Sequence, residues 1–116
     1  MHKGIVLLKR PKGTTVEEFK AWFLGPHLNF SRSRPEVLRY TGSFTVGPGP
    51  GSPYKDGEPD FDIIAEIWCK DLEAIQSAYA ALYAAGGVKD TLSHAGTRIA
   101  FIAEEHVVFD KLQGQG

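Results

Sequence analysis

The chain has 116 residues, 42% hydrophobic and 23% charged, a composition typical of one globular domain and unlike disordered or fibrous proteins. Thirteen basic against 14 acidic residues leave a formal charge of −1, which excludes a strong net field for nucleic acid or anionic membranes. The single cysteine, Cys69, excludes an intrachain disulfide and a site built from several thiolates. The apolar run Ile5–Leu8 is too short for a signal-peptide core, and no stretch approaches the roughly 20 residues of a membrane span, so we expect a cytoplasmic protein.

The first half of the chain predicts a strand, an interrupted helix and a second strand. Residues 3–9 are rich in aliphatic side chains, which is typical of a buried strand. Thr15 and Glu18 have the spacing of a capping box at a helix start. The apolar face of that helix comprises Val16, Phe19, Trp22 and Phe23. Gly25–Pro26 interrupts it, and residues 37–46 then alternate as a strand with one buried face does.

The second half predicts a loop, a strand and an alanine-rich helix. Residues 47–59 are rich in proline and glycine and form a long polar loop rather than a domain linker. Residues 61–69 form the third strand. Asp71 then caps a helix over residues 72–83.

The end of the chain completes a familiar order of elements. Residues 88–94 add a further helical turn, residues 98–109 form the last strand and residues 113–116 a flexible tail. The order β-α-β-β-α-β predicts an α+β, ferredoxin-like fold, with a four-stranded antiparallel sheet and two helices on one face. A single domain over residues 1–112 is therefore expected.

The predicted strands are apolar on both faces, which bears on the oligomeric state. Residues 61–69 place Ile63 and Ile67 on one face and Ile64 and Trp68 on the other. Helices cover only one face of such a sheet, so the second face needs a partner. The simplest partner is a second copy, and we expect a homodimer of the dimeric α/β-barrel type that encloses a cavity.

Four stretches, in order along the chain, resemble the EthD family of dimeric α/β-barrel proteins. They are Ile5–Arg10 with Thr15–Phe19, His27 eight residues after Phe19, Ala65–Trp68 with Asp71–Ala74, and Glu104–Val108. The resemblance implies a homodimer with a pocket between sheet and helix in each subunit. It also implies small, mostly apolar carbonyl or aromatic substrates, handled without metal or organic cofactor. Similar proteins include a methylmuconolactone isomerase and fungal polyketide dehydratases.

The candidate site combines an imidazole, a phenol and a carboxylate with aromatic rings. We predict His27, Glu66 and Tyr40 as catalytic residues, provided that the strand faces carrying them line one lumen. The predicted substrate-binding residues are Trp68, Asp62, His106, Trp22 and Phe23. Histidine, with an unperturbed pKa of about 6.5, moves protons at neutral pH, and an apolar cavity raises the pKa of a carboxyl group. Proton removal beside a carbonyl, with a phenol or imidazole holding the oxyanion, suits isomerisation or dehydration.

Each candidate also has a purely structural interpretation. His27 could cap the interrupted helix, and Glu66 could form an ion pair with Arg39 or Arg98. Trp68 and Tyr40 could serve only for packing. Asp62 could anchor a loop, and His106 could be a core or dimer contact.

The sequence therefore leaves several functions open. The first is a cofactor-independent enzyme (an isomerase, lyase or degradation enzyme) that acts on a small apolar oxygenated compound. The alternative is a non-catalytic ligand-binding or accessory protein of a catabolic or polyketide pathway. Haem or metal binding through His27 is a third interpretation, which the scattered histidines do not favour, so no metal site and no cofactor are predicted.

Overall fold

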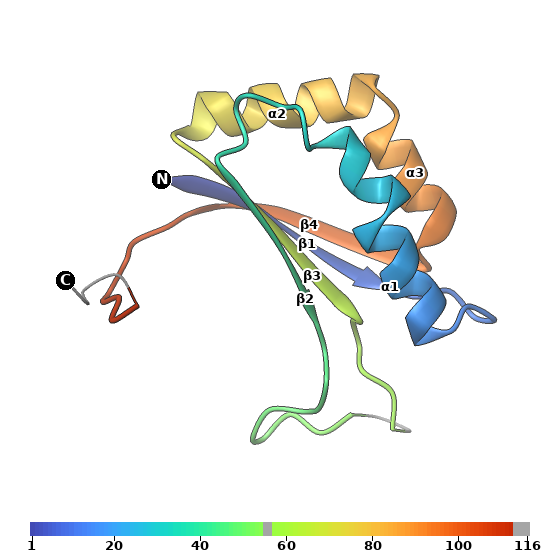
Figure 1. The fold of residues 1–116 in the computed structure, drawn as a ribbon. Coiled ribbons are helices and arrows are strands. Elements are labelled where there is room, and N and C mark those ends of the chain that lie inside the picture. The colour runs from blue at the N-terminus through green and yellow to red at the C-terminus, as the bar shows by residue number, and fades with distance from the viewer. Residues whose placement is uncertain (55–56, 113–116) are drawn as a thin grey trace.

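The computed structural model describes residues 1–54 and 57–112 and has the predicted order of elements (Figure 1). The elements are β1 (His2–Lys9), α1 (Val16–Leu24), the 3₁₀ helix η1 (Pro26–Phe30), β2 (Arg39–Phe44), β3 (Ile63–Cys69), α2 (Leu72–Ala84), α3 (Gly87–His94) and β4 (Thr97–Glu104). The predicted tail, residues 113–116, lies outside the described residues.

The four strands form one antiparallel sheet in the order β2-β3-β1-β4. Helices α1, α2 and α3 lie on one side of this sheet, and no helix of the described chain covers the other side (Figure 1). The structure confirms the predicted ferredoxin-like architecture. None of the described helices has the combination of length and apolar character needed to cross a bilayer.

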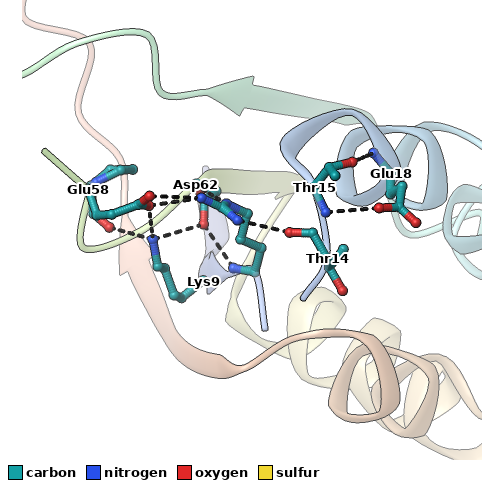
Figure 2. Close-up of polar contacts among 8 residues, drawn as sticks. Lys9, Thr14, Thr15, Glu18, Glu58 and Asp62 are labelled. Carbon is teal, nitrogen blue, oxygen red and sulfur yellow. Dashed lines mark hydrogen bonds and ion pairs between the residues drawn. The ribbon is translucent and has the colours of Figure 1, made fainter. Parts of the chain in front are cut away.

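The start of α1 is fixed by local hydrogen bonds (Figure 2). The hydroxyl of Thr15 accepts a bond from the Glu18 amide, and the Glu18 carboxylate accepts one from the Thr15 amide, each at 3.0 Å. This is the predicted capping box. The helix ends before Pro26, which opens η1, because proline lacks the N–H that a continuing helix requires. The chain turns at this point, so that His27 of η1 packs against Trp22 of α1 and lines a cavity between the helices and the sheet.

The core lies between the sheet and the helices in two clusters. The cluster under α1 contains Leu8, Phe19, Trp22, Phe23, Ile63 and Ala65, and the cluster under α2 contains Ile67, Cys69, Ile75 and Ala78. Two glycines allow aromatic rings to lie directly on the sheet. A Cβ at Gly42 would collide with the ring of Phe23, and one at Gly4 would collide with the hydroxyl of Tyr79.

The last strand is shorter than the sequence predicts. β4 ends at Glu104 because β1, the strand beside it in the described sheet, begins at His2, the residue that pairs with Glu104. One further backbone bond joins Glu105 N–H to the Met1 carbonyl at 2.9 Å. His106 therefore lies beyond the sheet, and strand alternation does not place its side chain.

Candidate active site

A partly open cavity of about 60 Å³ lies between the helix-covered face of the sheet and the elements η1, α2 and α3. Most of its wall is aliphatic or aromatic. The polar side chains that line it are His27, Ser31, Tyr40, Tyr79, Thr91 and Arg98. An apolar pocket with a few convergent polar groups is the usual form of a small-molecule site.

His27 enters this pocket from η1 and is held by aromatic rings. Its ring centroid lies 4.6 Å from that of Trp22 and 5.5 Å from that of Phe23. The Nδ1 atom lies 3.0 Å from Oδ2 of Asp90 in α3. A carboxylate only accepts hydrogen bonds, so the neutral imidazole carries its proton on Nδ1 and keeps a lone pair on Nε2. This tautomer leaves Nε2 as the basic atom of the site.

The Asp90 carboxylate joins three parts of the helical layer. Besides His27, it accepts a 3.1 Å hydrogen bond from the Trp22 indole N–H of α1. The Nδ1 atom of His94, one turn further along α3, lies 3.3 Å from the other carboxylate oxygen. The orientation of the carboxylate, and through it of the imidazole, is therefore fixed by contacts from α1, η1 and α3.

The contact between His27 and Asp90 was not predicted from the sequence. Asp90 lies 63 residues after His27. The only local signal was the spacing between Asp90 and His94, a pairing that is common on exposed helix surfaces.

The environment of His27 favours the neutral imidazole. Burial lowers the pKa of His27 below its usual value, and electrostatic interactions with His94 and Arg98 lower it further. The Asp90 carboxylate opposes this effect without reversing it. His27 is thus unprotonated at neutral pH and ready to accept a proton.

Replacing Asp90 by asparagine is expected to lower the pKa of His27 further. The amide oxygen still accepts a hydrogen bond from Nδ1, but the negative charge that favours the imidazolium is lost. An NMR titration of the His27 ring protons measures the change. Glu17→Gln, which removes the same charge from the exposed first turn of α1, is the matched control. An unchanged or raised pKa in Asp90→Asn would contradict the assigned contact.

Two tyrosines supply neutral hydroxyl groups to the pocket. Burial raises the pKa of Tyr40, and proximity to Tyr79 adds to the effect. Burial also raises the pKa of Tyr79, although the charge of Arg98 partly opposes it. Within residues 1–54 and 57–112, neither hydroxyl forms a side-chain hydrogen bond. Both are available as donors to a ligand oxygen.

The expected convergence of Glu66 with Tyr40 is wrong within one chain. Tyr40 pairs with Ile67 across β2 and β3, so it shares the helix-covered face with Ile67. Glu66 is the next residue along β3 and points to the opposite face. There its carboxylate lies 2.9 Å from Nζ of Lys3, not beside Arg39 or Arg98. In the single chain, Glu66 therefore has a structural ion pair and does not reach the pocket.

Trp68 shares the helix-free face with Glu66. Its indole N–H donates a 2.8 Å hydrogen bond to Glu105. The cations of Lys3 and Arg39 lie 4.9 and 4.6 Å from its ring centroid. These contacts hold Trp68 outside the pocket of its own chain.

Asp62 anchors a loop (Figure 2). Its buried carboxylate accepts a 2.8 Å hydrogen bond from the Arg10 amide and lies 3.5 Å from Nζ of Lys9. Lys9 in turn binds Glu58 and the Pro59 carbonyl, which attaches the long loop to the end of β1. This arrangement agrees with the loop-anchoring interpretation.

The remaining substrate-binding candidates also lie outside the pocket wall. Phe23 is only 1% exposed and packs in the core, and Trp22 contacts Asp90 and His27 from behind. His106 has a side chain that is 77% exposed, with Nε2 2.9 Å from Glu104. Of the eight predicted residues, the structure therefore brings His27 and Tyr40 together in the pocket, with Trp22 and Phe23 supporting them.

This fold and pocket can be compared with known proteins. The model of the EthD domain family matches residues 11–92, and the chain belongs to this family. The crystal structure of an EthD family protein from Bacillus halodurans is similar over 91% of this chain and 99% of its own. The two share 24% sequence identity with a TM-score of 0.73. The comparison with curated proteins found no match.

More distant structures share the fold. A hydroxynitrile lyase from Passiflora edulis has a TM-score of 0.71 and 13% identity, covering 94% of this chain and 96% of its own. A cofactor-independent oxygenase from Streptomyces nogalater has a TM-score of 0.61 and 14% identity, covering 93% and 97%. A protein from Thermobifida fusca described as dimeric and ferredoxin-like has a TM-score of 0.60 and 13% identity, covering 90% of each chain.

Proposed function

We propose that this protein is a cofactor-independent enzyme of the isomerase or lyase type, which moves a proton on a small apolar oxygenated compound. The observation that carries the proposal is the His27–Asp90 pair at a mostly apolar pocket. A partly buried imidazole with a lowered pKa and a carboxylate on its second nitrogen is the arrangement of a general base.

The geometry supports a simple reaction sequence. Nε2 of His27 accepts a proton from a carbon next to a carbonyl, and the C–H electron pair moves into the carbonyl to give an enolate. The hydroxyl of Tyr40 or Tyr79 donates a hydrogen bond to the enolate oxygen, and Asp90 stabilises the imidazolium. The imidazolium then returns the proton to another carbon, which is isomerisation, or to a departing group, which is elimination.

Two of the structural relatives support a catalyst over a binding protein. One is described as a hydroxynitrile lyase and the other as a cofactor-independent oxygenase, so enzymes occur on this fold. The pocket residues of the present chain carry the rest of the argument, because a fold alone does not define a reaction.

Solvent exchange tests the proposal without knowledge of the natural substrate. Small lactones and aromatic ketones are incubated with the protein in D₂O, and the signal of the C–H next to the carbonyl is followed by NMR. We expect the protein to accelerate loss of this signal. Binding of these compounds with exchange no faster than in buffer would instead support the non-catalytic accessory protein.

We also propose that the chain forms a homodimer through the helix-free face of its sheet. The cross-strand pairs Ile5–Phe101 and Leu7–Ile99 lie on this face, and Ile64 lies beside Leu7. Phe101 remains 48% exposed in the single chain. Such a contiguous apolar area on a sheet is typical of an interface, and one relative is described as dimeric.

Light scattering measures the predicted assembly. We expect a particle of twice 12.7 kDa at micromolar concentration and dissociation in Phe101→Glu, because the carboxylate would be buried between the sheets. Leu92→Glu on the exposed side of α3 is the control and should leave the mass unchanged. A particle of 12.7 kDa in the unsubstituted protein would contradict the proposal.

A further inference from the structure

Arg98 is a charged group in the pocket that the proposed proton transfer does not use. It lies on β4, paired with Leu8 of β1, and lines the same cavity as His27, Tyr40 and Tyr79. No side-chain hydrogen bond or ion pair connects its guanidinium to another residue in the part of the chain that the structure describes. An arginine guanidinium carries a positive charge throughout the physiological pH range.

The other arginines of the chain differ from Arg98, because each has a side-chain partner or is exposed to water. Arg10 binds Glu58 and lies close to Asp62, Arg34 binds Glu36, and Arg39 lies over the ring of Trp68. Arg32, which has no such partner among the described residues, is exposed to water. Arg98 is instead partly buried and faces an apolar wall, where an uncompensated charge is costly.

Among the described residues that line the cavity, none is acidic and able to balance this charge. The nearby carboxylate of Asp90 is already hydrogen-bonded to the side chains of Trp22 and His27. The charge of Arg98 nevertheless reaches the reacting groups, since it lowers the pKa of both His27 and Tyr79. The pocket thus combines an apolar wall, a neutral base, neutral phenols and one unpaired cation among its described lining residues.

We propose that Arg98 binds a carboxylate group of the ligand, so that the pocket selects small apolar organic acids over their neutral analogues. A guanidinium matches a carboxylate with two parallel hydrogen bonds and fixes the orientation of the molecule. The apolar remainder of the ligand then packs against Val6, Leu8 and Ile67 on the sheet. That the bound acid is also a substrate, with its reacting C–H beside His27, rests on the proposed function.

Binding of matched acids and amides tests this selection directly. The probes are benzoate with benzamide and hexanoate with hexanamide, titrated at millimolar concentrations and followed by NMR of the protein. The proteins are the unsubstituted chain, Arg98→Gln, Arg98→Lys and Arg32→Gln. Arg32→Gln is the matched control because it removes the same charge from an exposed position.

We expect the unsubstituted protein and Arg32→Gln to bind each acid more tightly than its amide. Arg98→Gln should weaken acid binding by about 10- to 100-fold, the usual effect of losing a charged hydrogen-bond partner, while amide binding stays within about twofold. Arg98→Lys should be intermediate, since the charge remains but the paired geometry is lost. A merely structural role for Arg98 would weaken acids and amides alike.

Two results would overturn the inference. One is that the unsubstituted protein binds each acid no more tightly than its amide, or binds neither acid detectably. The other is a preference for acids that survives in Arg98→Gln.

The exchange experiment in D₂O separates this inference from the proposed function. Arg98-dependent binding of acids without any exchange would leave the inference standing and remove the enzyme. Exchange that needs His27, together with acid binding that is no tighter than amide binding in the unsubstituted protein, would leave the enzyme standing and remove the inference.

Discussion

His27→Gln is expected to lower kcat for proton exchange by about 10²- to 10⁴-fold, the usual contribution of a general base, with a much smaller change in KM. Glutamine retains an N–H that can donate to Asp90 and has no titratable nitrogen. The pocket should therefore keep its shape and lose its base. Deuterium exchange on the best compound of the lactone and ketone panel measures the effect.

His94→Gln is the control for this experiment. It removes a second imidazole from the same Asp90 carboxylate, but His94 is half exposed and does not line the cavity. This variant should lose much less turnover than His27→Gln, because it changes only the surroundings of Asp90 and leaves the imidazole of His27 in place. If His27→Gln exchanges protons as fast as His94→Gln does, His27 is not the base.

Phe23→Ala is expected to have the largest effect on stability, lowering the free energy of unfolding by about 3–5 kcal/mol. The ring is 1% exposed, and its centroid lies 6.0 Å from those of both Tyr40 and Phe44. It lies against Gly42, where no side chain can move in to fill the space that truncation leaves. Urea unfolding at fixed protein concentration measures the loss.

The neighbouring Leu24 provides the comparison. It lies on the same helix but is 48% exposed, so Leu24→Ala should cost about 1 kcal/mol or less. Similar losses of unfolding free energy in the two variants would show that the buried ring of Phe23 contributes no more to stability than the exposed side chain of Leu24. A selective loss in Phe23→Ala would also be expected to loosen Tyr40 and His27, which both pack against its ring.

The fold was predictable because its signals are local. The capping box depends on Thr15 and Glu18, three residues apart, and the break depends on Pro26 alone. Strand alternation needs only neighbouring residues. The end of β4 was not predictable from such signals, because it depends on where β1 begins.

The site was predictable only in part, since it depends on relations between distant segments. Alternation predicts which residues of one strand share a face. Whether Tyr40 of β2 shares a face with Glu66 of β3 depends on the register between the strands, and this register pairs Tyr40 with Ile67 instead. Asp90 meets His27 across 63 residues, and Arg98 lies on the opposite edge strand from Tyr40. Neither the contact between Asp90 and His27 nor the position of Arg98 across the sheet from Tyr40 produces a recognisable pattern in a single sequence.

The two tryptophans of the chain lie on opposite sides of the sheet, which gives the protein two built-in optical reporters. The indole of Trp22 touches the carboxylate behind the imidazole, so its fluorescence should respond to occupancy of the cavity. Trp68 lies on the helix-free side, under two cations, where its fluorescence should respond to the proposed pairing of subunits. A variant that keeps only one of them would follow ligand uptake or assembly separately, without an added dye.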